Sequence, residues 1–316
     1  MTNTRAGFVA LIGEPNAGKS TLLNAMVGAK VAIVTHKVQT TRTRIRGVAM
    51  AECSVPEGSE DTPDKAQIVF VDTPGLFRPR RRLDRAMVAA AWAGAEDADL
   101  VCLLVEAHRG ITDGVEAILN SIDERTTRPV ALIINKIDRV KAEKLLKLTQ
   151  ELNERREFVA TFMISAHKGY GVPALKTFLA DQMAEGPLLY PEDEISDLPL
   201  RMIAAEITRE KLTLRLHQEL PYQLTVETES WKDQKDGSAR IGQVIYVGRD
   251  GHKGIVLGNK GETIKVVGSE ARAEIMELIG RKAHLFIEVK SRPGWLEEKE
   301  RFDAMGLDFS DGSVKK

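Results

Sequence analysis

The sequence has little cysteine, no long apolar run and almost no net charge. Its two cysteines, Cys53 and Cys102, are too few for a disulfide framework, and neither has a catalytic base or a metal-ligand cluster beside it. No apolar run approaches the ~20 residues that span a bilayer, and the polar residues 1–5 lack a signal-peptide core. A net charge of −1 over 316 residues, with a normal hydrophobic fraction, argues that the chain is globular rather than a tail or a fibre. These absences favour a soluble, globular, cytoplasmic protein, long enough for two domains.

The clearest motif present is GEPNAGKS at residues 13–20, which follows the apolar run 8–12 and opens a helix-like segment over 21–27. In this strand, loop and helix order, backbone N–H groups and the helix N-terminus face a polyphosphate. Lys19 is expected to reach the outer phosphates, and the Ser20 hydroxyl to ligate Mg²⁺. The motif therefore predicts a P-loop with these nucleotide-binding residues: Gly13, Asn16, Ala17, Gly18, Lys19, Ser20 and Thr21.

Two later apolar runs end in polar residues, where strand ends would bring them beside the phosphates. The run 67–71 ends in DTPG, from which Asp72 can hold Mg²⁺ through a water and the Gly75 N–H can sense a γ-phosphate. The run 130–134 delivers NKID, which ends at Asp138. An Asp at this rim can accept hydrogen bonds from N1–H and the exocyclic amine of guanine, a pair that adenine cannot offer. The predicted nucleotide is therefore GTP.

The rest of the base pocket is expected from the NKID motif itself and from Ser165-Ala166, which follow the run 158–164. Asn135 and Lys136 would brace the loop and cover the ring, and the Ala166 N–H would complete the pocket. For Ser165-Ala166 taken alone, an exposed turn is an equal alternative. The order of the motifs along the chain favours the base pocket.

These residues are similar to those of the GTPase superfamily, whose switch I threonine supplies a second Mg²⁺ ligand. In VQTTR at residues 38–42, the family pattern favours Thr41 as that ligand, with Thr40 as the alternative. A threonine that only caps a helix is the alternative without a role in metal binding. The resemblance implies Ser20, Thr41 and Asp72 as metal ligands. It implies catalytic roles for Lys19, Asn16 and Gly75.

Two positions bear on the mechanism of hydrolysis. Leu76 follows Gly75, where Ras-like enzymes carry a water-orienting glutamine, so slow intrinsic hydrolysis is expected. The water would then be positioned by the backbone, by switch I, by a partner or by another base. Asn16 matches the asparagine with which the TrmE–Era–EngA group helps to hold K⁺ in place of an arginine finger. Our hypothesis is that K⁺ accelerates hydrolysis through Asn16, and the alternative is a loop-stabilising amide.

The alternation of apolar runs and amphipathic stretches predicts an α/β P-loop GTPase domain, with a mostly parallel sheet and helices on both faces. Residues 51–65, rich in Gly, Pro and acids, predict a mobile hairpin extension without an essential role. The basic run 78–82 is interpreted as a solvated charge run, with an RNA or ribosome contact as the alternative. The expected divisions are a G domain at 1–185, a linker at 186–198, a second domain at 199–297 and a tail at 298–316.

The second domain is expected to be α+β. Its apolar spacing predicts a helix over 198–220, strands over 224–228 and 240–247, helices to 279 and a strand over 284–289. This element order is that of the type II KH fold. The GNKG sequence at 258–261 alone favours a helix-joining turn, but within this order it matches the loop that clamps single-stranded nucleic acid. The expected RNA contacts are Lys253, Ile255, Gly258, Asn259, Lys260, Gly261 and Lys265.

Nearly the whole chain resembles the Era family of bacterial GTPases, through GEPNAGKSTLLN, VQTTR, DTPG, NKID, SA, ELPY, GNKG and GW. The resemblance implies GTP hydrolysis to GDP and phosphate, and a KH domain that holds the single-stranded 3′ end of 16S rRNA. It also implies a role in 30S subunit assembly, with the 30S precursor as a partner of a monomeric protein. The alternative function is a membrane-associated GTPase switch in cell-cycle or stress signalling, in peripheral contact with the inner membrane.

Overall fold

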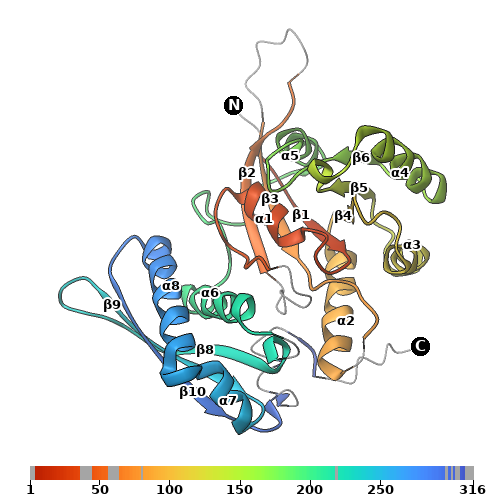
Figure 1. The fold of residues 1–316 in the computed structure, drawn as a ribbon. Coiled ribbons are helices and arrows are strands. Elements are labelled where there is room, and N and C mark those ends of the chain that lie inside the picture. The colour runs from red at the N-terminus through yellow and green to blue at the C-terminus, as the bar shows by residue number, and fades with distance from the viewer. Residues whose placement is uncertain are drawn as a thin grey trace. The chain divides into compact units, whose positions relative to one another are not determined.

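The computed structural model describes residues 4–35, 45–55, 64–79, 81–217, 220–295, 298–299, 302 and 307–309. They form two compact units, the first built mainly from residues 4–32 and 45–197 and the second mainly from residues 198–295 (Figure 1). Thr40 and Thr41, the candidate switch I ligands, lie outside the described residues, as does Arg80 of the basic run. Among the helices described, none is both long and apolar enough to cross a membrane.

The first unit is a doubly wound α/β domain, as the alternation of apolar and amphipathic segments predicted. Its sheet runs in the order β2-β3-β1-β4-β5-β6, and only the β2–β3 pair on this path is antiparallel. A short strand, β7, pairs with β1 in the antiparallel sense. The strands are β1 (Thr4–Gly13), β2 (Ile45–Glu52), β3 (Lys65–Asp72), β4 (Leu100–Glu106), β5 (Val130–Asn135), β6 (Ala160–Met163) and β7 (Ala184–Glu185).

Helices cover both faces of this sheet. Helices α2, α3 and α4 pack their apolar sides against β1, β4 and β5 on one face, and α1 and α5 lie against β2 and β3 on the other (Figure 1). Because the central strands are covered on both sides, β4 and β5 are buried along their whole length. The helical segments are α1 (Lys19–Val27), α2 (Arg82–Asp97), α3 (Asp113–Arg125), η1 (Ile137–Arg139), α4 (Ala142–Arg155) and α5 (Val172–Asp181).

The parallel strands bring the predicted motifs to one edge of the sheet. Leu11 of β1 pairs with Asp72 of β3, and Glu106 of β4 pairs with Asn135 of β5. The P-loop begins at Gly13, where β1 ends. The carboxyl ends of these strands therefore place the phosphate, metal and base motifs side by side.

The segment that sequence analysis interpreted as a linker is anchored to the first unit. The Gln67 side chain of β3 accepts hydrogen bonds from Leu189 N (2.8 Å) and Tyr190 N (2.9 Å) and donates one to Tyr190 O (2.9 Å). Val48 N donates to Ile195 O (2.9 Å). The predicted hairpin extension follows the β2–β3 pair. These two strands pair as far as Glu52 and Lys65, and residues 56–63 of the extension lie outside the described residues.

The change Gln67→Leu is expected to lower the free energy of unfolding by about 2–3 kcal/mol, because it removes the three hydrogen bonds that join this fully buried amide to the backbone of Leu189 and Tyr190. Chemical denaturation measures the loss, and hydrogen exchange should quicken at the Leu189 and Tyr190 amides. Gln150→Leu, on an exposed face of α4, is the matched control. Unchanged exchange at Tyr190 in the Gln67 variant would contradict the anchoring role.

The second unit has the predicted helix, strand, strand, helix, helix, strand order of a KH domain. Its sheet runs β10-β9-β8, with β9 and β10 parallel and β8 and β9 antiparallel. The first helix is shorter in the structure than the predicted range 198–220, because Leu216 leaves helical geometry. The first strand is longer in the structure than the predicted range 224–228. A bulge between Thr228 and Ser230 interrupts the alternation of apolar and polar residues by which the sequence could have shown the rest of the strand. The elements are α6 (Leu200–Arg215), η2 (Leu220–Gln223), β8 (Leu224–Asp233), β9 (Ala239–Val247), α7 (Asp250–Leu257), η3 (Asn259–Gly261), α8 (Glu262–Ile279) and β10 (Ala283–Ser291).

Helices α6, α7 and α8 pack on the same face of the sheet in the second unit (Figure 1). The core there joins Leu212 of α6, Val256 of α7 and Val267 of α8 to inward residues of the strands, such as Ile245 and Val289. The alternate residues of β9 and β10 point to the other face, which these helices do not cover. The two faces of this sheet therefore have different environments.

Candidate functional site

The P-loop adopts a conformation that its glycines make possible. Asn16 and Gly18 have positive φ angles of 68° and 100°. A Cβ at Gly18 would lie 2.2 Å from Nδ2 of Asn135, so no other residue fits there without displacing the amide. Gly18 is also the N-cap of α1, whose first residue is Lys19. The turn of the loop thus leads directly into a helix N-terminus, the part of a helix that favours an anion.

Lys19 is held inside this loop. Its side chain is only 6% exposed, and Nζ donates hydrogen bonds to the carbonyl oxygens of Gly13 (3.1 Å) and Glu14 (3.0 Å). Burial lowers the pKa of Lys19 to about 8, although the nearby Asp72 and Glu14 carboxylates favour the charged form. The loop therefore holds a desolvated cation whose charged form a polyphosphate would stabilise.

The depressed pKa predicts a pH dependence of nucleotide affinity. A phosphate-bound Lys19 must carry its proton, whereas in the nucleotide-free protein the proton is lost as the pH rises through about 8. Affinity for GDP should therefore be flat below about pH 7 and weaken by up to roughly tenfold per pH unit above 8. Titration calorimetry from pH 6.5 to 9.5 measures this slope. In Lys19→Met, binding should be weaker at every pH and the slope should disappear; a slope that persists would assign it to another group.

The two described candidates for metal ligation lie next to each other. Ser20 Oγ, in the first turn of α1, donates a hydrogen bond of 2.7 Å to Oδ2 of Asp72 at the end of β3. Asp72 is fully buried. A hydroxyl and a carboxylate are hard oxygen donors of the type that Mg²⁺ takes, so this donor set fits that ion. The third predicted ligand, Thr41, lies outside the described residues.

The DTPG segment packs directly on the P-loop. Thr73 Oγ1 donates to Leu11 O (2.7 Å), and Leu76 N donates to Gly13 O (2.9 Å). A Cβ at Gly75 would lie 2.8 Å from Pro15 N. The close approach of the two loops at Gly75 therefore requires a residue without a side chain.

Asn135 links three of the predicted motifs. Its Nδ2 donates to Ala17 O in the P-loop (2.9 Å), and its Oδ1 accepts from Lys136 N (2.8 Å) and Ala166 N (3.0 Å). The side chain is 1% exposed. Sequence analysis expected the Ala166 N–H to contact the base, whereas here it donates to Asn135. The bracing role expected for Asn135 agrees with these contacts.

Lys136 and Asp138 follow Asn135 at the rim. Lys136 has a positive φ of 63°, and its Nζ donates to Asn16 O (2.6 Å) and pairs with Glu106 Oε1 (3.0 Å). Asp138 is exposed, and its Oδ1 accepts a hydrogen bond of 2.5 Å from Ser165 Oγ. This hydrogen bond lowers the pKa of Asp138, so the group is an ionised acceptor at neutral pH.

Two acidic residues in this site were missed by the sequence analysis. Glu106 ends β4 at the same edge as Asp72, so the strand-end argument that found Asp72 also applies to it. Glu14 occupies a variable position of the P-loop motif, and only the structure shows that it accepts a hydrogen bond from Thr112 Oγ1 (2.7 Å) and lies 3.6 Å from Arg109. Both acids position loops that carry predicted contacts.

The GNKG loop of the second unit is a tight turn between α7 and α8. Gly258, Lys260 and Gly261 have positive φ angles of 76°, 50° and 78°. The side chains of Asn259 and Lys260 are exposed at its tip. In α7, Ile255 is 58% exposed while its neighbour Val256 is fully buried in the core. The loop therefore presents two polar side chains to solvent, and α7 before it presents one apolar side chain.

Comparisons with known proteins agree with both units. A family model described as a 50S ribosome-binding GTPase matches residues 8–136, and one described as a KH domain matches residues 219–296. The GTPase Era of Dinoroseobacter shibae is 72% identical over 313 residues, which cover 98% of this chain and 98% of that protein. The chain belongs to the Era family of GTPases. The GTPase Era of Mesorhizobium japonicum is 57% identical over 306 residues, covering 97% of this chain and 94% of the relative.

Two solved Era structures share the fold over both units. One is Era in complex with MgGDPNP and nucleotides 1506–1542 of 16S ribosomal RNA, with a TM-score of 0.87 and 35% identity, covering 96% of this chain and 99% of that chain. The other is a variant of Aquifex aeolicus Era bound to GDP.AlF4⁻, with a TM-score of 0.86, 35% identity and the same coverage. As a member of the Era family, the protein is a GTPase with an N-terminal G domain and a C-terminal KH domain.

Proposed function

We propose that this Era GTPase binds 16S rRNA near its single-stranded 3′ end and assists assembly of the 30S subunit in the cytoplasm. The observation that carries the proposal is the GNKG loop, a tight turn between two helices with exposed Asn259 and Lys260. KH domains clamp the nucleic-acid backbone with such a loop. The RNA in the solved Era complex, nucleotides 1506–1542 of 16S rRNA, supports the choice of RNA.

The RNA contacts are proposed around that loop. Gly258 and Gly261 allow the backbone to approach RNA closely, and the exposed Lys253, Lys260 and Lys265 supply cations for its phosphates. Ile255 offers an apolar contact to a base. The proposed KH domain comprises residues 199–297, and the linker before it comprises residues 186–198.

The GTP contacts are proposed at the edge of the sheet in the first unit. Residues 13–21 bind the phosphates, and Asp138 reads the guanine. Asn135, Lys136, Ser165 and Ala166 hold the base loops in place. Ser20 and Asp72, with Thr41 from outside the described residues, would hold Mg²⁺, which neutralises phosphate charge when bound. The presence of MgGDPNP in the solved Era complex supports this metal.

A dependence of hydrolysis on K⁺ is proposed through Asn16. Its backbone is fixed, since φ is 68° and its carbonyl accepts from Lys136 Nζ. The GTPase rate should be roughly tenfold higher or more in K⁺ than in Na⁺, because a fixed cation stabilises charge that develops in the transition state. Asn16→Ala should abolish the difference between the two salts. Equal GTPase rates of the unaltered protein in K⁺ and in Na⁺ would contradict the proposal. An equal slowing of the variant in both salts would indicate that Asn16 only stabilises the loop.

RNA affinity is proposed to depend on the nucleotide, with GTP and Mg²⁺ ordering the switch threonine and the Gly75 segment. The test is the affinity of the full chain for nucleotides 1506–1542 of 16S rRNA, with GDPNP or with GDP. Binding should be tighter with GDPNP, and equal affinities would exclude coupling through binding energy. No binding in either state would overturn the RNA proposal itself. Sedimentation with 30S precursors and with anionic vesicles then distinguishes ribosome assembly from the peripheral membrane switch.

A further inference from the structure

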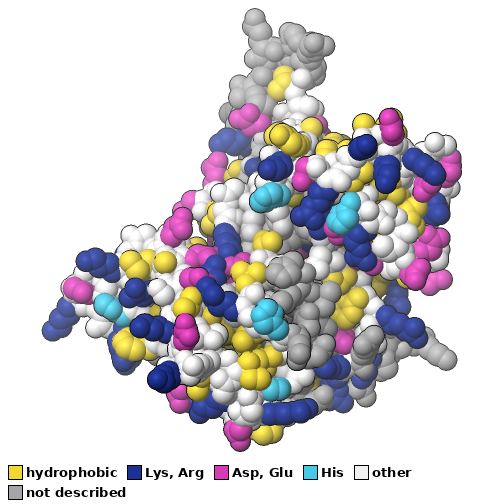
Figure 2. Space-filling view, viewed as in Figure 1, with side chains coloured by type: hydrophobic (Ala, Val, Ile, Leu, Met, Phe, Trp, Pro, Cys, Tyr) yellow, Lys and Arg dark blue, Asp and Glu magenta, His cyan; other side chains and the backbone are white. Residues whose placement is uncertain are grey.

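The face of the KH sheet away from its helices carries a row of basic residues. Strand pairing places Lys232 of β8, Arg240 of β9 and His284 of β10 next to one another across the three strands. All three side chains are exposed. Lys and Arg side chains also gather around the tip of the β8–β9 hairpin (Figure 2). This end of the sheet therefore offers several cations on one surface.

An exposed aromatic ring lies beside this row. The next row across the strands is Ser230, Gly242 and Phe286, so the middle strand has no side chain there. Phe286 is 52% exposed, and the Arg240 guanidinium carbon lies 4.6 Å from its ring centroid. Arg240 already lies over the ring in a cation–π contact, so a planar group would stack on the exposed part of the ring that the guanidinium leaves open.

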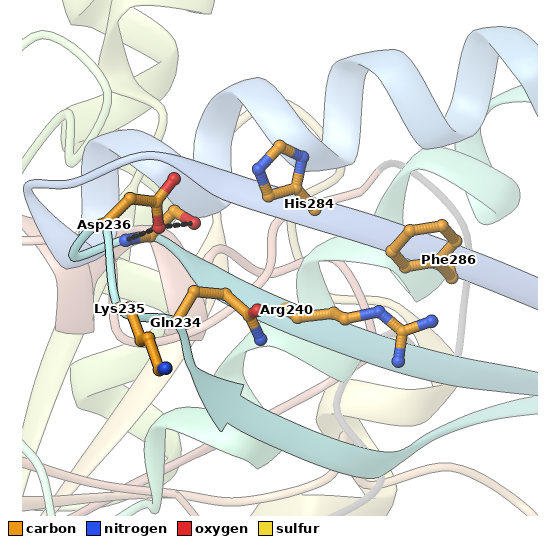
Figure 3. A pocket seen from close by; sticks show the side chains of 7 residues that line it. Gln234, Lys235, Asp236, Arg240, His284 and Phe286 are labelled. Carbon is orange, nitrogen blue, oxygen red and sulfur yellow. Dashed lines mark hydrogen bonds between the residues drawn. The ribbon is translucent and has the colours of Figure 1, made fainter.

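These residues line an open pocket of about 550 Å³, bordered by Gln234, Lys235, Asp236, Arg240, His284 and Phe286 (Figure 3). Figure 3 shows the Arg240 side chain extending along β9 toward Phe286, with His284 before Phe286 on β10. Lys235 and Gln234 enter from the hairpin turn. The pocket is large enough for a nucleotide rather than for a water or a single ion.

The acids near the pocket have partners in the hairpin turn and in the segment between α8 and β10. Asp236 Oδ1 accepts from Ser238 N (3.0 Å) and Ser238 Oγ (2.7 Å), and Asp233 pairs with Arg281 (2.5 Å). Among the described residues, no carboxylate lies within 4.0 Å of the charged groups of Lys232, Lys235 or Arg240. The Asp236 carboxylate keeps its charge, because its hydrogen bonds to Ser238 lower its pKa. Two cations, Lys235 and Arg240, therefore face one carboxylate in the pocket lining, and the small positive excess complements a phosphate.

The pocket has a boundary farther along the sheet. In the next row, Val244 is 3% exposed and lies between Glu227 and Glu288. Two carboxylates would repel a nucleic-acid backbone, so the favourable surface ends after the Phe286 row. An acidic peptide would use the cations but would not use the exposed part of the Phe286 ring. A base and its phosphate use both features.

We propose that this open face is a second RNA site, which binds a nucleotide of a single strand by stacking its base on Phe286 and holding its phosphate with Lys235 and Arg240. The inference rests on the proposed RNA binding and adds to it a contact separate from the GNKG loop. That loop joins the helices that cover the opposite face of the sheet. Stacking on an aromatic ring tolerates any base, so the second site contributes affinity more than sequence specificity.

The test compares two RNA probes with the full chain in Mg²⁺ and GDPNP. The long probe is nucleotides 1506–1542 of 16S rRNA, and the short one is a 3′ fragment of about six nucleotides, little more than the ~4 that a KH loop clamps. Phe286→Ala and Arg240→Ala should each weaken the long probe about tenfold and leave the short probe unchanged. Phe286→Trp should retain affinity for the long probe. Tyr170→Ala, which removes an exposed aromatic from the first unit, is the matched control.

Three outcomes would overturn the second site. The first is unchanged affinity of both variants for the long probe, and the second is an equal loss for both probes, which would indicate a general disturbance of the domain. The third is weakened binding to anionic vesicles with RNA binding unchanged. Failure of the proposed function has a different signature, since the unaltered chain would then bind neither probe.

Discussion

Asp138→Asn is expected to change the nucleotide preference of the protein from GTP to XTP. The carboxylate accepts from both N1–H and the exocyclic amine of guanine, whereas an asparagine amide would turn a donor toward that amine. The loss of GTP affinity should be about 2–4 kcal/mol, roughly 30- to 1,000-fold. Xanthine has a carbonyl in place of the amine and should bind the variant well. Competition of GTP and of XTP against a fluorescent GDP measures the affinities of the variant for the two nucleotides.

The structure supplies a control for this experiment. Asp123 is an exposed carboxylate on α3 whose partner is Arg156. Asp123→Asn removes the same charge and should leave both nucleotide affinities unchanged. The Ser165 hydroxyl can still donate to an asparagine oxygen at position 138, so the loop should keep its shape. If the Asp138 variant kept the preference for GTP, another group would read the base.

Gly258→Ala is expected to remove most of the RNA affinity. A Cβ at this position would lie 2.2 Å from Thr263 Oγ1 and 2.9 Å from Thr263 N, at a φ of 76° that alanine rarely adopts. The turn must therefore move, and backbone N–H groups lose their phosphate contacts. Two such charge-assisted hydrogen bonds are worth about 3 kcal/mol, or roughly a hundredfold in affinity. Fluorescence anisotropy with nucleotides 1506–1542 of 16S rRNA measures the effect.

Gly251→Ala is the matched substitution, since no atom lies within 4 Å of a Cβ built at that position in α7. It should bind RNA as the unaltered chain does. GTP hydrolysis without RNA should be the same in both variants, because neither glycine belongs to the G domain. RNA binding by Gly258→Ala at full strength would show that this loop does not hold the RNA.

The sequence predicted most of the fold, because local patterns determine it. The runs that end in Asp72 and Asn135 are strands, and the GNKG loop lies between two helices, as expected. The contacts that join the motifs were not predictable in the same way. Asn135 binds Ala17 O across 118 positions of sequence, and Gln67 binds residues more than 120 positions away. Such pairs depend on strand register and loop paths that no local pattern encodes.

The open face of the KH sheet illustrates the same limit. Lys232, Arg240 and His284 come from three strands, and they become neighbours only through the pairing of β8, β9 and β10. The bulge between Thr228 and Ser230 shifts the alternation of β8, so a period of two along the sequence would assign Lys232 to the wrong face. The cationic row is therefore a product of tertiary structure.

The amide of Asn135 has a consequence for how the nucleotide leaves. One buried side chain closes the P-loop, the NKID loop and the Ser165-Ala166 turn together. We therefore expect release of the base and release of the phosphates to be coupled, since loosening either end breaks hydrogen bonds of the same side chain. A factor that displaced this one amide would then be expected to accelerate product exchange.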